Sequence, residues 1–195
     1  MAIDPSNFYK SSVIDTCAIW NILSSQLLYT ISTNAGCLFC CTYFVYYECL
    51  YKPRNNPKQS EIDLQNRFRQ EYKNGKFKYY HLTIEDLQDV EILQKRMNID
   101  KGELASIAFA KKTRQAFLTD DQGARKLAAQ VMPSNMVQTT PHLLGWLLFI
   151  SYLNDNDLQK IISEHQKFHR PLKKYFLELY TLVLEYKLKA YTNSA

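Results

Sequence analysis

Short apolar runs that alternate with stretches of helical spacing are the feature that most constrains the fold of this chain. The runs lie near residues 13–14, 37–45, 78–82, 115–119 and 136–139. Between them, apolar residues recur every three or four positions, which predicts helices. Strands that alternate with helices are typical of βαβ units, in which parallel strands form one sheet covered by helices. We therefore predict an α/β fold with three layers, α/β/α, around a central parallel sheet.

The chain ends in a long helical region. From Pro141 onward the pattern is helical, with predicted breaks near 154–157 and at Arg170-Pro171. A length of 195 residues is that of one domain, and 46% hydrophobic with 22% charged residues is ordinary for a soluble protein. We predict a domain over 1–153 and a C-terminal helical extension over 154–195 packed on it.

The cysteines favour a reducing compartment. All five have apolar neighbours and are interpreted as small buried side chains rather than disulfide partners. Cys37-x-x-Cys40 with His165-x3-His169 is an alternative zinc set, but structural zinc sites usually combine two close-spaced pairs. We favour histidines satisfied on a surface helix.

No apolar run reaches the roughly 18 residues of a membrane span, and the first residues lack the pattern of a secretory signal. We expect a cytoplasmic protein with no membrane partner.

Acidic residues follow the apolar runs in a regular order. Asp15 ends the first run, Asp120-Asp121 end a later one, Glu48 follows the second, and Glu103 opens a helix. Ligands of open parallel sheets bind beyond the carboxyl ends of the strands. Gathered carboxylates repel one another and are most readily kept where a divalent cation neutralises them. Ligation by oxygen alone favours Mg²⁺ or Mn²⁺, the ions of phosphodiester hydrolysis.

Each acid also has a structural interpretation. Asp15, Asp120 or Asp121 would each serve as a helix N-cap, and Glu48 would be an ordinary residue of a helix face. Asp100-Lys101-Gly102-Glu103 has the spacing of a capping box, in which Glu103 reaches back to the helix start. For each acid taken singly, such a structural role is a sufficient explanation. The order of all the acids together favours a functional site.

The order and context of the acids resemble the motifs of PIN-domain nucleases, especially the VapC-type toxin ribonucleases. The matching stretches are VIDTCAIWNIL, FVYYECLY, DKGELASIAFAKK, FLTDDQGARKLA and MVQTTPHLLGWLL, which span roughly residues 11–153. The resemblance implies a PIN-like three-layer fold and a metal-dependent endoribonuclease that uses Mg²⁺ or Mn²⁺. It further implies an RNA substrate, an antitoxin protein as a partner, and a toxin–antitoxin role.

The resemblance assigns catalytic roles to Asp15, Glu48, Glu103 and Asp121. Asp15 and Asp121 would bind metal directly, and Glu48 and Glu103 would complete the shell or orient the attacking water. Two departures matter. The third acid is often Asp in the family and is Glu103 here, and the fourth motif offers both Asp120 and Asp121 as metal ligands, of which we favour Asp121.

The segment 52–78 is strongly basic. It holds eight Lys or Arg against three Asp or Glu, an excess equal to the net charge of +5 of the whole chain. Interleaved aromatics, among them Phe68 and Tyr72, either stack on unpaired bases or belong to the core. The candidate nucleic-acid-binding residues are Lys52, Arg54, Arg67, Arg69, Arg125 and Lys126. The same surface is an alternative seat for a partner helix, and the last helix packs on the body or on a second copy of the chain, as in a homodimer.

Competing functions remain. One is a non-catalytic RNA-binding or scaffold module on the same fold, and another is a structure-specific DNA nuclease. A phosphoryl-transfer protein of a different doubly wound family is disfavoured, because Asp15-Thr16-Cys17 supplies neither an acidic pair nor Asp-x-Asp. No phosphate-binding glycine loop and no Ser/His/Asp arrangement is convincing.

Overall fold

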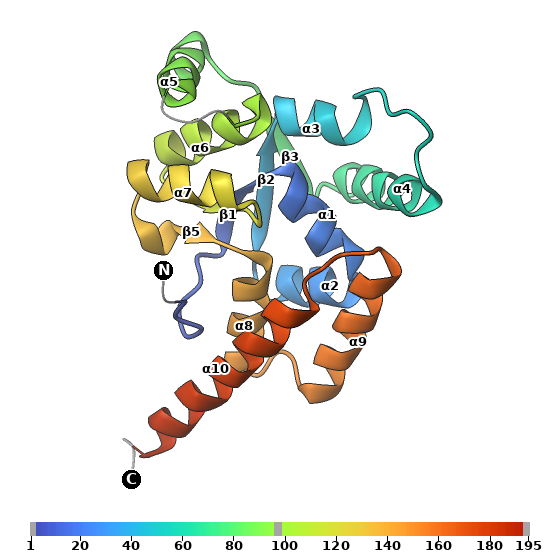
Figure 1. Cartoon of the computed structure of the whole chain (residues 1–195), viewed down its shortest axis with the longest axis vertical. Helices are drawn as coiled ribbons and strands as arrows, with labels where there is room; N and C mark the ends of the chain where they lie inside the picture. The colour runs from blue at the N-terminus through green and yellow to red at the C-terminus, as the bar shows by residue number, and fades with distance from the viewer. Residues whose placement is uncertain (1–2, 96–98, 193–195) are drawn as a thin grey trace.

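A parallel sheet of five strands lies at the centre of the computed structural model, which describes residues 3–95 and 99–192 (Figure 1). The strands are β1 (Ser11–Ile14), β2 (Leu38–Thr42), β3 (Phe77–Tyr80), β4 (Ala116–Leu118) and β5 (Val137–Gln138). Their order is β3-β2-β1-β4-β5, and every neighbouring pair is parallel. The predicted α/β class and parallel sheet are confirmed.

Successive side chains of each strand enter opposite faces of the sheet, as the pleat requires. In β1, Val13 belongs to one hydrophobic core and Ile14 to the other. In β4, Phe117 and Leu118 divide in the same way. All four are fully buried, so the sheet is covered on both faces, which explains why the strands are continuous apolar runs rather than alternating ones.

Helices from different parts of the chain cover the two faces. The first core contains residues of α5 (Ile84–Gln94), α6 (Lys101–Thr113) and α7 (Gln122–Val131). The second contains residues of α1 (Thr16–Ser24), α2 (Gln26–Asn34), α3 (Tyr43–Leu50), α4 (Gln59–Lys73), α8 (Thr140–Phe149), α9 (Asp155–Lys167) and α10 (Lys173–Thr192). A short 3-10 turn, η1 (Ser134–Met136), precedes β5.

Local signals set several helix ends. Thr83 caps α5, and the Asp86 carboxylate accepts a hydrogen bond from the Thr83 N–H at 2.7 Å, which completes a capping box. Gly75 follows the end of α4 with a φ of +70°, a conformation that glycine adopts without strain. Helix α5 ends at Gln94.

The C-terminal extension is packed on the body. Helix α10 lies along α8, and α9 contacts α2 (Figure 1). The approach of α10 to α8 is close at Gly145, where a Cβ atom would lie 3.0 Å from Leu179 Cδ1. Phe176 and Val183 of α10 are buried in the same core as the α8 leucines. Among the helices of residues 3–95 and 99–192, none has the length and apolarity that crossing a membrane would require.

The strand order creates a switch point between β1 and β4. Chain connections lead outward from β1 toward β3 on one side and from β4 toward β5 on the other. In open α/β sheets, ligands bind outside the carboxyl ends of the strands where the order reverses. Asp15 directly follows β1, and Thr119 directly follows β4, so both lie at this point.

Candidate functional site

Asp15 is a carboxylate buried at the end of β1. Only 1% of the residue is exposed. One carboxylate oxygen accepts the Ala18 N–H at 2.8 Å, which caps α1, and the other accepts a short hydrogen bond from the Thr119 hydroxyl. Burial raises the pKa of Asp15 from 3.8 to about 7, against the lowering effect of both hydrogen bonds, and the charges of Asp120 and Glu103 add to the rise.

Glu103 lies in the first turn of α6, within the electrostatic reach of other acids. Burial raises its pKa from 4.5 to about 7, and the charges of Asp121, Asp100 and Glu48 contribute. Half of the predicted capping box is present: the Asp100 backbone hydrogen-bonds to the Glu103 side chain, but the Asp100 side chain caps no N–H. Glu103 is therefore both a helix-start residue and a member of an acidic cluster.

Glu48 projects from α3 toward the same place. Its Oε2 accepts a hydrogen bond from the Thr16 hydroxyl at 2.8 Å, and its Oε1 lies 3.3 Å from Lys52 Nζ. Gly102 leaves room for it, because a Cβ at that position would lie 3.1 Å from Glu48 Oε2. Thr16 and Thr119 thus each hold one carboxylate.

The two neighbouring aspartates have different surroundings. Asp120 accepts hydrogen bonds from the Asn21 amide at 2.7 Å, from the Thr140 N–H at 2.9 Å and from the Thr140 hydroxyl at 2.5 Å. These bonds tie the end of β4 to α1 and α8. Asp121 uses one oxygen, Oδ1, to accept the Ala124 N–H at 2.8 Å and cap α7. Asp120 is thus committed to holding elements together, while Asp121 keeps an oxygen without such a bond in the part of the chain described.

A pocket of about 290 Å³ opens beside the acids. We call it the acidic pocket; its lining residues are Thr16, Cys17, Trp20, Glu48, Asp100, Glu103 and Arg170. Asp15 and Asp121 do not line it, although both interact electrostatically with Glu103. The structure therefore brings the four predicted catalytic acids to one region, with two of them on the pocket wall.

The donor set suits a hard divalent cation in chemistry but is not assembled around one point. Carboxylate and hydroxyl oxygens are the ligands that Mg²⁺ and Mn²⁺ prefer. The pKa values of Asp15 and Glu103 are raised first by burial and then by neighbouring carboxylates. Across residues 3–95 and 99–192, however, no three His, Cys, Asp or Glu side chains are close enough together to hold an ion. The zinc alternative has no assembled ligand set in these residues either.

Most of the basic residues predicted for nucleic acid have protein contacts. Arg67 donates to the Leu23 carbonyl at 2.7 Å and lies 4.7 Å over the Phe168 ring. Arg69 donates to the Leu50 carbonyl at 3.4 Å, and Lys52 pairs with Glu48. These contacts join α4 and the α3–α4 connection to the body.

Arg54 also has protein contacts, and it donates to the Glu48 carbonyl at 3.5 Å. It lies 3.7 Å from Glu61 and 5.5 Å from the Trp20 ring centroid. Phe68, for which stacking and core packing were both open, is fully buried in the core.

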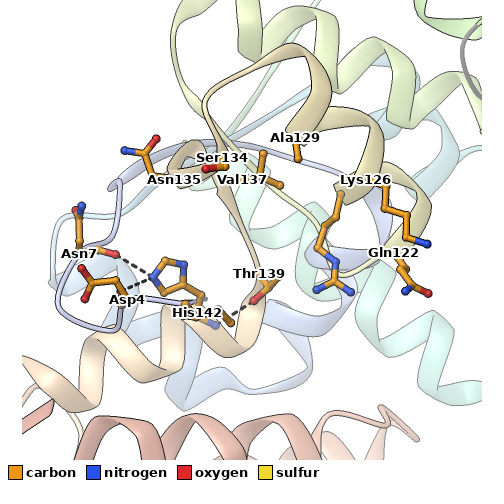
Figure 2. Close-up of a pocket in the computed structure, with 12 residues that line it drawn as sticks. Asp4, Asn7, Gln122, Lys126, Ala129, Ser134, Asn135, Val137, Thr139 and His142 are labelled. Atoms are coloured by element: carbon orange, nitrogen blue, oxygen red, sulfur yellow. Dashed lines mark hydrogen bonds between the residues drawn. The ribbon is translucent and has the colours of Figure 1, made fainter. Parts of the chain in front are cut away.

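Arg125 and Lys126 line a different cavity of about 460 Å³, beside α7. Figure 2 shows Lys126 and Gln122 at one end of it and the His142 ring at the other. His142 Nε2 lies 2.9 Å from the Asp4 and Asn7 carbonyl oxygens, so this nitrogen carries a proton and donates to them. Burial lowers the pKa of His142, which keeps the ring neutral. The His142 ring thus holds the N-terminal segment against α8.

The histidine prediction for the C-terminal region was wrong in one respect. His165 is 1% exposed rather than on the surface, and its Nε2 has no hydrogen-bond partner in the described structure. Its Nδ1 lies 2.9 Å from the Ile161 carbonyl. Cys37, Cys40, Cys41 and Cys49 are buried free thiols as predicted, and Cys17 is partly exposed at the acidic pocket.

Sequence reasoning missed three residues of this region. Arg170 lines the acidic pocket, and Asn21 and Thr140 hold Asp120. Their sequence positions are remote from the acidic motifs, and the only signal near Arg170 was the helix break before Pro171. Comparison with protein-family models, with curated proteins and with solved structures gave no match for this chain.

Proposed function

We propose that this chain is a metal-dependent endoribonuclease of the PIN type that hydrolyses RNA phosphodiester bonds with an activated water. The observation that carries the proposal is the cluster of Asp15, Glu103 and Asp121 at the switch point of the sheet. Two members have pKa values raised to about 7 by burial and mutual repulsion. Perturbed carboxyls beside a pocket are typical of functional sites.

The residues of the chain have separate roles in this reaction. Glu103, on the pocket wall with a pKa of about 7, is suited to accept a proton from water near neutral pH. Glu48, held by Thr16, orients the water or the phosphate. Asp15, held by Thr119 and the start of α1, supplies a buried carboxylate within electrostatic reach of Glu103.

Mg²⁺ or Mn²⁺ would be held by Asp15 and Asp121, with Asp120 as the alternative to Asp121 and with Glu103 completing the shell. These side chains do not converge on one point within the described residues, so binding would require them to move toward the ion. Bound there, the ion would lower the pKa of water and neutralise charge on the phosphate. Asp120 is disfavoured as a ligand because both of its oxygens already accept hydrogen bonds from Asn21 or Thr140.

A role as a toxin with an antitoxin partner is a part of this proposal that rests on the motif resemblance alone, and a homodimeric state rests on the apolar faces of the last helix. A second candidate is a non-catalytic RNA-binding module. It is favoured by one observation: no three metal-ligating side chains of the described residues converge on one point.

The test is cleavage of a mixed RNA pool by the pure protein in Mg²⁺, in Mn²⁺ and in EDTA, with single-stranded and flap DNA in parallel. The test variant is Glu103→Gln, and the matched control is Glu91→Gln, the same chemical change at an exposed position of α5. We expect metal-dependent RNA cleavage that the test variant loses and the control retains. General-base catalysis contributes about 10²–10⁴-fold, so the loss should be in that range.

Two other results have clear meanings. RNA binding without cleavage in either metal would replace the nuclease by the binding module. Cleavage that is equal in Glu103→Gln and Glu91→Gln would refute the role of Glu103 and, with it, the site.

A further inference from the structure

Arg170 is an arginine that the C-terminal extension brings to the acidic pocket. It lies in the connection between α9 and α10, and its N–H donates to the His165 carbonyl at 3.0 Å. His169 before it is left-handed, with a φ of +55°, and Pro171 after it has a restricted φ. The backbone at Arg170 is therefore held in place.

The side chain of Arg170 is half-buried, and its guanidinium has few protein partners. Its Nε is buried and has no hydrogen-bond partner. Within the described ranges, its guanidinium is not among the groups that lie within 4.0 Å of a carboxylate. Burial lowers its pKa, against the favourable charges of Cys17 and Glu61. Charged groups withdrawn from water are normally paired, so a half-buried guanidinium at a pocket, without a carboxylate partner in the described ranges, indicates a place for an anion.

The position of Arg170 identifies where that anion would lie. Arg170 lines the acidic pocket with Glu48 and Glu103, and it also lines a second cavity of about 250 Å³ with Arg54 and Glu61. Trp20 and Arg170 are common to both cavities. The two cavities therefore adjoin at Trp20 and Arg170, with the carboxylates of Glu48 and Glu103 on one side and Arg54 on the other.

We propose that Arg170 binds a backbone phosphate of single-stranded nucleic acid next to the bond that is cut. This inference rests on the proposed function, and it adds to that function a phosphate-binding residue from outside the motif region. The planar fork of a guanidinium matches two phosphate oxygens.

The C-terminal extension would then contribute directly to the site. Residues 154–195 would not only pack against α8 and α2 but also supply one wall of the acidic pocket. The bound strand would run from Glu103, past Arg170, toward Arg54. Arg54 already has Glu61 as an ion-pair partner, whereas Arg170 has none in the described ranges, so Arg170 is expected to contribute more to binding.

The test compares Arg170→Gln and Arg170→Lys with Arg114→Gln as the matched control. Arg114 is exposed at the far end of α6, about 16 Å along the helix axis from Glu103. Binding of a fluorescent single-stranded RNA is measured in EDTA as a function of salt, and cleavage is measured with Mn²⁺. Thermal unfolding of each variant checks that it is folded.

We expect Arg170→Gln to bind RNA at least about tenfold more weakly than wild type, the size of one lost charge-assisted contact. The slope of the logarithm of its RNA-binding constant against the logarithm of the salt concentration should be smaller in magnitude by about 0.7, the value for one phosphate contact to a single strand. Arg170→Lys keeps the charge but not the planar fork, so its RNA affinity should lie between those of wild type and Arg170→Gln. The affinity of Arg114→Gln should match that of wild type. If Arg170→Gln does not fold, the comparison of Arg170→Lys with Arg114→Gln decides: equal binding overturns the proposal.

The outcomes separate this inference from the proposed function. If the wild type cleaves RNA and Arg170→Gln binds and cleaves equally well, the nuclease stands and the role of Arg170 is refuted. If the wild type cleaves nothing but Arg170→Gln still loses binding, the nuclease fails and the phosphate-binding role stands. If the wild type does not bind RNA at all, both are refuted.

Discussion

Replacing Asp15 by asparagine should stabilise the folded protein in metal-free buffer at neutral pH. The ionised carboxylate is buried, and its pKa is raised from 3.8 to about 7, chiefly by desolvation. Each pKa unit corresponds to about 1.4 kcal/mol, so the ionised Asp15 costs the folded state at most about 4 kcal/mol. Asparagine keeps the acceptor for the Ala18 N–H but cannot accept the Thr119 hydroxyl at its amide nitrogen, which costs about 1 kcal/mol. Allowing for relaxation of the site, the expected gain is about 2 kcal/mol.

The gain should depend on pH in a defined direction. The unfolded state releases the Asp15 proton near 3.8 and the folded state near 7, so the wild type loses stability as the pH rises from about 4 to about 7. Above that window the difference is constant, and below it the advantage of asparagine vanishes. Activity should be lost at every pH, because the substitution removes the Asp15 carboxylate from the site.

The assay is urea unfolding of wild type and Asp15→Asn in EDTA at several pH values from 4 to 8, with Asp89→Asn on α5 as the matched control. Addition of Mn²⁺ should then stabilise the wild type more than Asp15→Asn, by mass action. An Asp15→Asn protein that is less stable than wild type throughout, or more stable by an amount independent of pH, would show that the burial argument is wrong.

Two further predictions concern the surroundings of the site. Asp120→Ala should lower the free energy of unfolding by about 3 kcal/mol, because the amide and hydroxyl donors on Asn21 and Thr140 lose their acceptor. Asp121→Ala should lower it by only about 1 kcal/mol, the value of a helix cap. Equal losses in urea titration would contradict the different structural roles of the two aspartates. Gly145→Val should destabilise by about 1–3 kcal/mol through overpacking against Leu179, 3.0 Å from the added Cβ. The same glycine change combined with Leu179→Ala should cost less than the two separate effects together, and strict additivity in thermal unfolding would argue against close packing of α10 on α8.

The sequence by itself determined the elements and the residues at their ends. Buried strands appear as apolar runs because both faces of the sheet are covered, and Thr83-x-x-Asp86 specifies a helix start through bonds within four residues. Asp15 and Asp120-Asp121 could be placed at strand ends for the same reason: the information is local in the chain. The acids of the candidate site were therefore named from the sequence, and their functional roles stay predictions.

Only the tertiary structure decided which of these ends meet. The neighbouring positions of β1 and β4 depend on strand order, which no local pattern encodes, and that order brings Thr119 to Asp15. Asp120 and Asp121 are adjacent in sequence and differ because Asn21 and Thr140, from remote helices, bind only Asp120. Arg170 reaches the acidic pocket through the packing of the extension. Such contacts are set by the burial of whole helix faces, a property of the folded chain rather than of any single segment.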